Sequence, residues 1–367
     1  MEYKVISANR APNRANKNWR IFEKESLERY FGPVLDVNGE DGKSVVEAYN
    51  RYKNSIEYIR WYPDPELITL QEYNGMVNQS NAIGNIPYIT NSAKGFINVQ
   101  CKEEAFKVWK DNKIHCPDFF TFENEKDFFV QQEHHKVSLP FLLRVNNSVN
   151  GYHSFAVYKE EDIKPTLKKL DSLFTNYTKT NSRIKTTKMC IHLFQTADKE
   201  KGINSSFRVH VAGDKVISGY ARVVDNTDWC AITSGKFKSK NIDHFIEHNI
   251  LCEEIMNNFE QEIVRAVHTL GLNHQGVDII IDKQTNELVF LEVQPTYSSG
   301  YPPNGGGSYR PPYYNPYDPF LVSFLTENKQ ELSKLFPKYY FNWLDKKNHF
   351  DLVYKNLKSY IDKNENV

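Results

Sequence analysis

The sequence is poor in the features that mark several classes of protein. Its five cysteines are widely spaced and contain no C-x-x-C pair, which argues against a disulfide framework or a cysteine zinc site and favours reduced thiols. The amino-terminal segment has no apolar run of signal-peptide length, and no stretch approaches the ~20 apolar residues that span a bilayer. We therefore expect a cytoplasmic protein without a membrane partner.

An excess of charge of either sign is also missing. The 46 Lys and Arg residues match the 46 Asp and Glu residues, and the formal net charge is +0. Nucleic-acid binding usually depends on excess positive charge, so nucleic acid is not an expected partner. The sequence also lacks a G-x-S-x-G nucleophile elbow, a Walker A phosphate-binding run and a Rossmann glycine fingerprint, and so contains neither this nucleophile motif nor these two nucleotide-binding motifs.

The chain does contain enough apolar residues to form a large hydrophobic core. Of its 367 residues, 40 % are apolar and 14 % aromatic, and this length suggests two or three domains of about 100–200 residues each. Residues 1–95 mix short apolar runs with polar stretches and predict a small α/β unit. From residue 140 the pattern changes to strands and hairpins, and the tail beyond residue 318 has a helical pattern.

Four segments carry the clearest local patterns. Residues 103–113 have apolar residues at helical spacing and predict an amphipathic helix. Residues 251–270 have apolar residues at intervals of four and predict one long helix that ends before Gly271. Residues 206–224 and 276–295 each contain two β-rich runs around a polar turn, and each predicts a β-hairpin.

The second hairpin carries the strongest signal of a site. Asp278 lies near the start of its first strand, and Glu292 and Gln294 lie near the end of the partner strand. Residues two apart on a strand point to the same face, so Glu292 and Gln294 project together, and cross-strand pairing can bring Asp278 beside them. Two carboxylates and an amide oxygen form a hard ligand set that suits Mg²⁺ bridging nucleotide phosphates. The alternative is that these are ordinary solvated positions on an amphipathic hairpin.

The same hairpin resembles the end of an ATP-grasp domain. There a strand with an aspartate is followed by E-x-N-P, and this chain has GVDIII, a short tip and then FLEVQP. Other segments resemble further parts of that family in the family's order: CK before the helix at 103–113, PFLLRV with NNSVNGYHS, CIHLF, and SSFRVHVAGDKVISGYARV. The last segment is most similar to the ribosomal-S6-modifying and glutathione-synthetase-like branch. The resemblance covers about residues 96–300.

The resemblance implies an α/β (α+β) ATP-grasp fold, in which two lobes with antiparallel sheets clasp a nucleotide. A small α/β domain is expected to precede the two lobes, and a helical extension is expected to follow them. In chain order, the implied divisions are the amino-terminal domain at 1–95, the first lobe at 96–187, the second lobe with the metal site at 188–320, and the helical extension at 321–367.

The nucleotide contacts that the resemblance implies begin with two basic residues. Lys102 would contact the α and β phosphates of ATP, although a solvated lysine at a helix start is the alternative interpretation. Arg144 would take the second basic position, where the family more often has lysine. The phosphate-covering loop and the backbone that reads adenine would supply the remaining contacts: Asn146, Ser148, Gly151, His192 and Leu193.

The catalytic and metal-binding residues are implied in the same way. Arg208 and Arg222 would neutralise the transferred phosphate, for which the planar fork of donors on arginine is well suited. Mg²⁺, or Mn²⁺ in its place, would be held by Asp278, Glu292 and Gln294. Gln294 replaces the usual asparagine, and Cys230 and Ile232 stand where the S6-modifying branch commonly has an arginine and an asparagine. We therefore do not expect this chain to share the substrate-acceptor contacts of that branch at these two positions.

The implied activity is that of an ATP-dependent carboxylate–amine ligase. A small-molecule carboxylate attacks the γ-phosphate to give an acyl phosphate and ADP, and an amine, such as that of an amino acid or peptide, then displaces phosphate. Two alternatives stay open: an ATP-grasp phosphotransferase, and a nucleotide-binding protein without turnover. The Gly-, Pro- and Tyr-rich loop at 297–319 either helps to form the acceptor pocket or is a surface loop without a role.

Overall fold

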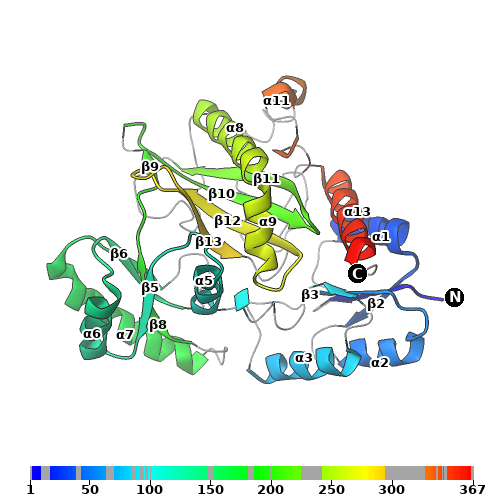
Figure 1. The fold of residues 1–367 in the computed structure, drawn as a ribbon, viewed down its shortest axis with the longest axis horizontal. Helices are drawn as coiled ribbons and strands as arrows, with labels where there is room; N and C mark the ends of the chain where they lie inside the picture. The colour runs from blue at the N-terminus through cyan, green and yellow to red at the C-terminus, as the bar shows by residue number, and fades with distance from the viewer. Residues whose placement is uncertain are drawn as a thin grey trace.

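Three β-sheets, each built mainly from a different part of the chain, form the framework of the protein (Figure 1). The computed structural model describes residues 2–9, 17–38, 43–62, 70–84, 88–90, 95, 98–99, 101–146, 153–180, 186–198, 200–224, 242–293, 327–335, 338–340, 342 and 345–364. Within these residues, no helix is both long enough and apolar enough to cross a bilayer.

The first sheet belongs to the amino-terminal unit. It is wholly parallel, with the order β2-β1-β3-β4, and consists of β1 (Val5–Asn9), β2 (Val34–Asn38), β3 (Tyr58–Tyr62) and β4 (Tyr88–Thr90). The connecting helices are α1 (Lys17–Phe31), α2 (Lys43–Tyr52) and α3 (Leu70–Ile83), of which α1 lies on one side of the sheet and α2 and α3 on the other (Figure 1). The small α/β unit predicted at the start of the chain is present.

The second sheet is antiparallel and has the order β5-β8-β6-β7. Its strands are β5 (Phe119–Phe122), β6 (Phe141–Val145), β7 (Ser154–Val157) and β8 (Lys188–His192). Two helices, α6 (Glu125–His135) and α7 (Ile163–Thr180), cover one face, where Phe128 and Leu170 are buried against Phe141. A short 3₁₀ turn at Glu160–Asp162 leads into α7.

The position of β8 corrects one expected domain boundary. A division between residues 187 and 188 would place this strand with the third sheet. Instead, β8 lies between β5 and β6 and pairs with both, so it belongs to the second sheet. The physical reason is the apolar run Met189-Cys190-Ile191, which is buried. A central strand has a neighbouring strand on each side, and this position keeps such a run away from water.

The third sheet has the order β11-β10-β12-β13 and carries the two predicted hairpins. These are β10 (Ile203–Ala212) with β11 (Lys215–Val224), and β12 (His274–Ile281) with β13 (Leu288–Val293), and a short strand β9 (Ala197–Asp198) pairs with β10. One face packs against helices α8 (Ile242–Asn258) and α9 (Glu260–His268) through a core that includes Phe207, Val277 and Ile263.

The helix predicted at 251–270 is two helices rather than one. The backbone leaves helical geometry at Phe259, where φ is −117° and ψ is 19°, and α9 begins at the next residue. Glu260 accepts a hydrogen bond from the backbone N–H of Val216 at 3.2 Å, which ties the start of α9 to the third sheet. Gly271 follows α9 with φ of +78°, as expected for a glycine beyond a helix end.

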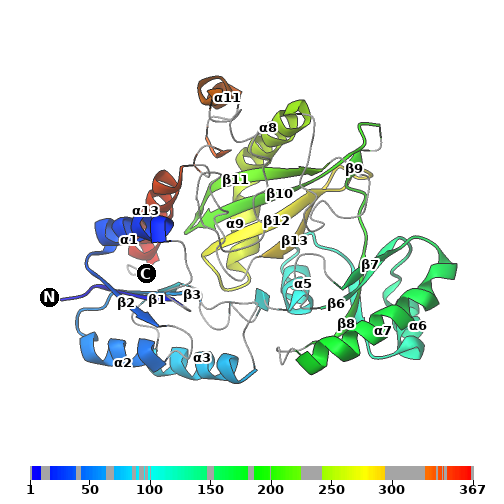
Figure 2. The same cartoon turned by 180° about the vertical axis from the view of Figure 1, so that it is seen from behind.

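Helix α5 (Lys102–Asp111) lies at the junction of the second and third sheets, as Figure 2 shows. Its Trp109 is fully buried, packs against Phe290 of β13 and donates a 2.8 Å hydrogen bond from Nε1 to the carbonyl of Ala266 in α9. The helix predicted at 103–113 is therefore confirmed, and its apolar face is buried against the third sheet.

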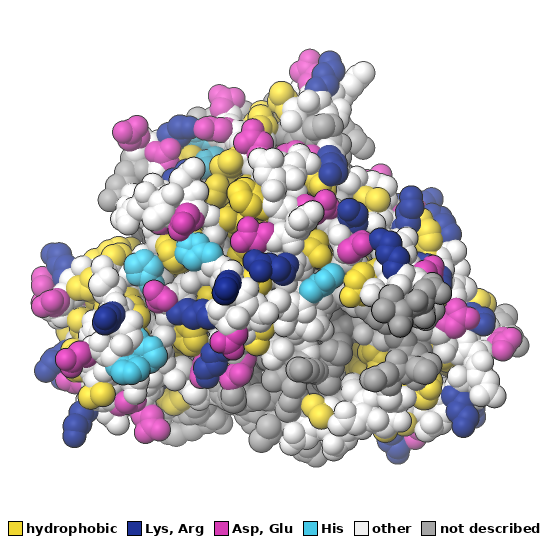
Figure 3. Space-filling view, viewed as in Figure 1, with side chains coloured by type: hydrophobic (Ala, Val, Ile, Leu, Met, Phe, Trp, Pro, Cys, Tyr) yellow, Lys and Arg dark blue, Asp and Glu magenta, His cyan; other side chains and the backbone are white. Residues whose placement is uncertain are grey.

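The carboxyl-terminal helices are α11 (Lys329–Leu335) and α13 (Lys346–Asn364). Helix α13 packs beside α1 (Figure 1). A core cluster joins Leu27 and Phe31 of α1 to Val353 and Leu357 of α13 and to Ile217 of β11. The last helix therefore attaches the amino-terminal unit to the third sheet. On the face seen in Figure 3, basic and acidic side chains are interspersed over the described surface.

Candidate functional site

A row of charged residues crosses the third sheet. Arg208 on β10 pairs with Asp278 on β12, and Asp278 pairs in turn with Glu292 on β13. Directly paired residues share a face of the sheet, so the three side chains project to the same side. The predicted cross-strand placement of Asp278 beside Glu292 is confirmed, with a register shift immediately after Asp278.

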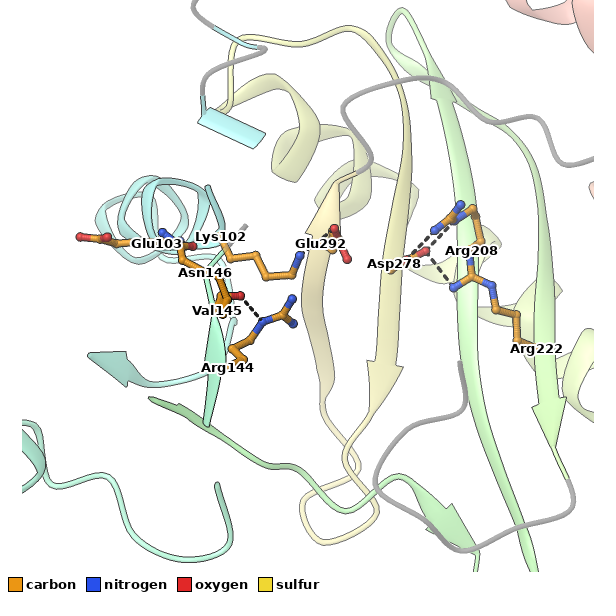
Figure 4. Close-up of polar contacts among 9 residues, drawn as sticks. All are labelled: Lys102, Glu103, Arg144, Val145, Asn146, Arg208, Arg222, Asp278 and Glu292. Carbon is orange, nitrogen blue, oxygen red and sulfur yellow. Dashed lines mark hydrogen bonds and ion pairs between the residues drawn. The ribbon is translucent and has the colours of Figure 1, made fainter. Parts of the chain in front are cut away.

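Asp278 is bound by two arginines (Figure 4). Arg208 donates from Nε to Oδ1 and from Nη2 to Oδ2, both at 2.6 Å, and Nη1 of Arg222 lies 3.2 Å from Oδ1. All three groups are buried. Burial alone would raise the pKa of Asp278, but the Arg208 and Arg222 guanidinium groups outweigh it and hold this pKa well below its ordinary value. Asp278 is therefore a carboxylate that fixes two cations.

Glu292, the second carboxylate of the row, forms an ion pair with Lys102 of α5. Nζ of Lys102, the first residue of α5, lies 2.7 Å from Oε1 of Glu292, with the two side chains 11 % and 26 % exposed. Burial lowers the pKa of Lys102, Glu292 opposes that change, and the charge of Arg144 adds to it. Among the described residues, Oε2 of Glu292 makes no hydrogen bond or ion pair.

Arg144 lies near the end of β6 and is buried. Its Nε donates a 3.2 Å hydrogen bond to the carbonyl of Val145. In Figure 4, Arg144 and Lys102 reach from the second sheet and from α5 toward Glu292, while Arg208 and Arg222 approach Asp278 from the other side. The structure thus brings together four of the predicted basic residues and both predicted carboxylates.

Asn146 has a different arrangement from the one expected. Its amide oxygen accepts a 3.2 Å hydrogen bond from the backbone N–H of Glu103, its amide nitrogen donates to Oγ1 of Thr187 at 3.1 Å, and its backbone N–H donates to the carbonyl of Thr187. The residue is fully buried. These bonds attach the start of α5 to the second sheet, so Asn146 positions Lys102 rather than presenting its amide to a phosphate.

The backbone of His192 and Leu193 is also partly engaged within the protein. The N–H of His192 donates to the carbonyl of Asp118 at 2.8 Å, and the N–H of Leu193 donates to the carbonyl of Pro140 at 3.1 Å. Neither N–H can therefore serve as a donor to adenine in this arrangement. The predicted adenine contact is limited to their carbonyl oxygens.

Three expected site residues, Ser148, Gly151 and Gln294, lie outside the described residues. So do the loop at 297–319 and the two positions that depart from the S6-modifying branch, Cys230 and Ile232. Within the described part of the chain, no group of three or more His, Cys, Asp or Glu residues is arranged to hold a metal ion. Glu292 fits a metal ion, because its side chain is 26 % exposed and Oε2 makes no hydrogen bond or ion pair with the described residues. Asp278 does not fit in this arrangement, because a metal there would lie beside two guanidinium groups.

Two further residues of this face, Tyr220 and Ser206, are not among the predicted site residues. Tyr220 pairs directly with Arg208, and its ring lies 5.6 Å from Cζ of Arg222. Ser206 pairs directly with Arg222. The signal was the alternation of Ser206, Arg208 and His210 on β10, since polar residues with a period of two inside an otherwise apolar strand mark one polar face.

Comparison with known proteins shows what this architecture resembles. No family model matches the sequence, and no curated protein matches it. N5-carboxyaminoimidazole synthetase from Staphylococcus aureus, solved with ADP, matches 82 % of this chain and 73 % of its own, with 11 % identity and a TM-score of 0.50. The ATP-grasp ligase PsnB, solved with a minimal precursor, matches 80 % of this chain and 91 % of its own, with 11 % identity and a TM-score of 0.49.

A third solved structure, N5-carboxyaminoimidazole ribonucleotide synthetase from Thermotoga maritima, matches 80 % of this chain and 68 % of its own, with 12 % identity and a TM-score of 0.46. At such low identity the likeness concerns the fold and not the substrates. The antiparallel second and third sheets, with α5 between them and a parallel α/β unit before them, agree with it. The chain therefore has an ATP-grasp fold, as the sequence resemblance implied.

Proposed function

We propose that this chain is an ATP-dependent, ADP-forming ligase, which activates a carboxylate as an acyl phosphate and joins it to an amine. The ATP-grasp fold supports binding of ATP, and the charged cluster between the second and third sheets supports a site for its phosphates. The observation that carries the proposal is the balance of charge in this cluster. Within the part of the chain that the structure describes, Lys102, Arg144, Arg208 and Arg222 lie together with two carboxylates, Asp278 and Glu292.

This imbalance calls for an anion. Five of the six side chains are buried and that of Glu292 is 26 % exposed, and among the described residues the cations of this cluster outnumber its carboxylates by two. A buried positive charge is stabilised by nearby negative charge, because the interior cannot replace the hydration that the ion loses. A triphosphate supplies several negative charges along one chain, and the cations face it from two sides. A nucleotide triphosphate is therefore the ligand whose charge and shape best complete this cluster.

The same arrangement suits phosphoryl transfer. Transfer of the terminal phosphoryl group to a carboxylate oxygen needs charge neutralisation and alignment more than it needs a protein nucleophile. Lys102 and Arg144 would hold the nucleotide phosphates from one side. Arg208 and Arg222, fixed by Asp278, would neutralise the negative charge of the group in transfer. The resulting acyl phosphate is attacked by an amine, and phosphate leaves.

A divalent cation fits this site at Glu292. Mg²⁺, with Mn²⁺ as a substitute, would share Glu292 with oxygens of the nucleotide, and Gln294 would be the second protein ligand. When bound, the ion supplies further neutralisation of phosphate charge. Lys102 holds Oε1 of Glu292 and so leaves Oε2 as the oxygen oriented for the ion.

A screen for substrate-stimulated ADP release tests the proposal. Purified protein with Mg²⁺ and ATP is tested against amino acids, short peptides and small carboxylates, and ADP, free phosphate and condensed product are measured together. The proposal predicts that one combination of a carboxylate and an amine yields ADP, free phosphate and a condensed product. Lys102→Ala is expected to reduce turnover on the order of a hundredfold, as removal of a phosphate-neutralising cation does. Lys107→Ala, which alters an exposed lysine on the same helix, is the matched control and should retain full activity.

The other outcomes of this screen are equally informative. ADP with a phosphorylated product but no free phosphate would identify a phosphotransferase. Tight ATP binding without ADP release across the whole panel would identify a nucleotide-binding protein without turnover. Either result would overturn the ligase proposal.

A further inference from the structure

A hydrogen-bonded bridge of three side chains, His210, Ser218 and His349, joins the third sheet to the carboxyl-terminal helix. Oγ of Ser218 on β11 lies 2.8 Å from Nδ1 of His210 on β10 and 3.2 Å from Nδ1 of His349 in the first turn of α13. All three residues are fully buried. The two imidazole rings meet edge to face, with their centroids 5.5 Å apart. The bridge therefore links the sheet to α13 through buried polar groups.

The chemistry of the hydroxyl gives the bridge a defined arrangement. A serine hydroxyl has one proton, so it donates to Nδ1 of one neutral imidazole and accepts from the Nδ1–H of the other. The two rings then carry opposite tautomers. Removal of one member leaves a buried polar atom of its neighbour without that partner, and such a loss costs more than the net gain of an ordinary hydrogen bond. This cost favours one orientation of each ring.

A β-bulge directs the bridge toward α13. The pairing of β10 with β11 shifts register immediately after His210, which leaves Ile217 as an extra residue on β11. A bulge turns a side chain away from the face that regular alternation would give it. Ile217 shares a core with α13, and the next residue, Ser218, contacts His349 of the same helix. Both neighbours on β11 therefore face α13.

The opposite edge of the His210 ring lies beside Arg208. The two residues are two apart on β10 and share the polar face of the third sheet. Gly276 is the direct partner of His210 on β12, and a side-chain carbon placed on it would lie 3.3 Å from Cδ2 of His210 and 3.5 Å from Cδ of Arg208. The ring and the stem of Arg208 thus lie side by side over the glycine. Because Ser218 fixes the Nδ1 edge of the ring, it also fixes the edge that borders Arg208.

We propose that His210, Ser218 and His349 are positioning residues for Arg208, through which α13 supports the phosphate site. The inference rests on the proposed function, in which Arg208 neutralises the phosphoryl group in transfer. Asp278 holds the guanidinium end of Arg208 with two hydrogen bonds of 2.6 Å, and the bridge limits where the aliphatic stem can lie. A displaced stem would misdirect the donors of Arg208. By reciprocity, a ligand that binds the placed guanidinium also strengthens the attachment of α13.

Three variants of the bridge are compared with one control on the same helix. His349→Leu and Ser218→Ala remove hydrogen bonds of the bridge. His349→Asn is the conservative variant, because its amide can occupy the position of Nδ1 and keep the bond to Ser218. Tyr354→Phe removes a buried hydroxyl of α13 that bonds to Glu23 and Arg60, so it weakens the attachment of the helix without altering the bridge. Circular dichroism and thermal unfolding check that each variant folds.

The first measurement observes Arg208 without any ligand. Its Nε–H, which donates to Asp278, gives an NMR signal in protein labelled with ¹⁵N-arginine, and Arg208→Lys identifies that signal by its loss. His349→Leu and Ser218→Ala are expected to shift or broaden the signal, His349→Asn to restore most of its wild-type position, and Tyr354→Phe to leave it unchanged. An unchanged signal in both His349→Leu and Ser218→Ala would overturn the proposal. So would an equal change in Tyr354→Phe, because general loosening of α13 would then explain the effect.

The second measurement is calorimetric titration with ADP and with the non-hydrolysable ATP analogue AMPPNP, with Mg²⁺ present. The two ligands differ by the terminal phosphoryl group, which Arg208 is proposed to neutralise. His349→Leu and Ser218→Ala should weaken AMPPNP binding by about fivefold or more, the lower end of usual coupling between sites, and leave ADP affinity unchanged. Unchanged AMPPNP affinity, or an equal loss for both nucleotides, would overturn the proposal. Failure of the wild-type protein to bind either nucleotide would instead overturn the proposed function, and the NMR comparison would still decide whether the bridge positions Arg208.

Discussion

Lys102 at the start of α5 and Glu292 on β13 form an ion pair of 2.7 Å, although 190 residues separate them in the sequence. The contact depends on how α5 is held. Trp109 anchors the helix to α9 and β13, and Asn146 attaches its first turn to the second sheet. Lys102 is therefore placed by both sheets at once, in the position where it can neutralise a ligand bound between them.

Replacement of Glu292 tests the metal assignment. Because Oε2 of Glu292 is the described carboxylate oxygen open to a metal ion, Glu292→Gln should raise the Mg²⁺ concentration needed for half-maximal activity by at least about 10–100-fold. Electron paramagnetic resonance of Mn²⁺ measures metal affinity independently of turnover. Glu287→Gln on the same hairpin, whose side chain is 62 % exposed, is the control. Unchanged Mn²⁺ affinity in Glu292→Gln would remove Glu292 as a ligand.

Asp278→Asn should act on stability more than on metal affinity. The change leaves the buried Arg208 and Arg222 without their counter-charge, and breaking a buried pair on one side costs about 3–5 kcal/mol of unfolding free energy. Tripolyphosphate should restore more stability to this variant than to the wild type, since it replaces the missing negative charge. Urea unfolding with and without tripolyphosphate measures both effects. An equal response of the two proteins would contradict the role of Asp278 as a counter-charge.

The depressed pKa of Asp278 predicts a pH dependence of stability. A carboxyl group whose folded pKa lies below its unfolded value, about 3.9, stabilises the protein above that pH and loses this contribution as the pH falls toward the folded pKa. Wild-type stability should therefore decline below about pH 4. Asp278→Asn should show a shallower decline over the same range, because it has no proton to take up there. Parallel slopes for the two proteins would exclude this contribution.

Asn146→Ala should weaken nucleotide binding without removing any ligand contact. The substitution frees the backbone N–H of Glu103 and the hydroxyl of Thr187, at a cost of about 1–3 kcal/mol, and loosens the first turn of α5 with Lys102. Asn112→Ala, at the opposite and exposed end of α5, is the control. Calorimetric titration with AMPPNP compares the variants. Asn146→Asp keeps the acceptor for Glu103 and should recover part of the lost affinity, which loss of a direct phosphate donor would not allow.

The hydroxyl of Tyr354 should contribute to the attachment of α13. It donates to Glu23 at 2.7 Å and accepts from Nε of Arg60 at 3.1 Å, and all three side chains are buried. Tyr354→Phe removes the hydroxyl from a buried charged network and should cost about 1–3 kcal/mol. Guanidinium unfolding followed by tryptophan fluorescence measures the loss. A change below about 0.5 kcal/mol, typical of surface substitutions, would show that Glu23 and Arg60 satisfy each other alone.

The parts of the fold that the sequence predicts are those set by neighbours along the chain. The alternation of apolar residues and the short polar tips define both hairpins of the third sheet, and the placement of Asp278 beside Glu292 follows from strand geometry alone. The helix at 102–111 follows from its spacing of apolar residues. By contrast, the apolar pattern of β8 would suit a central strand of the second or of the third sheet. Its pairing with β5 and β6, which the pattern does not contain, places it in the second sheet.

The site shows the same division. Strand geometry and ligand chemistry predict Asp278 and Glu292, the ATP-grasp resemblance implies Lys102, Arg144, Arg208 and Arg222, and the structure brings all six together. Which carboxylate each basic residue contacts depends on their positions in three dimensions. The contact of two arginines with Asp278 could therefore not be predicted from the sequence pattern. The contacts of Asn146 could not be predicted for the same reason, because its partners Glu103 and Thr187 lie 43 and 41 residues away.

The packing of α13 against α1 bears on how the protein is made. Leu27 and Phe31 share a core with side chains of residues 346–364, which are synthesised after the third sheet. While the ribosome makes the second and third sheets, this apolar surface of α1 therefore lacks the partner that covers it in the fold. The amino-terminal unit consequently completes its core only after the third sheet has been made.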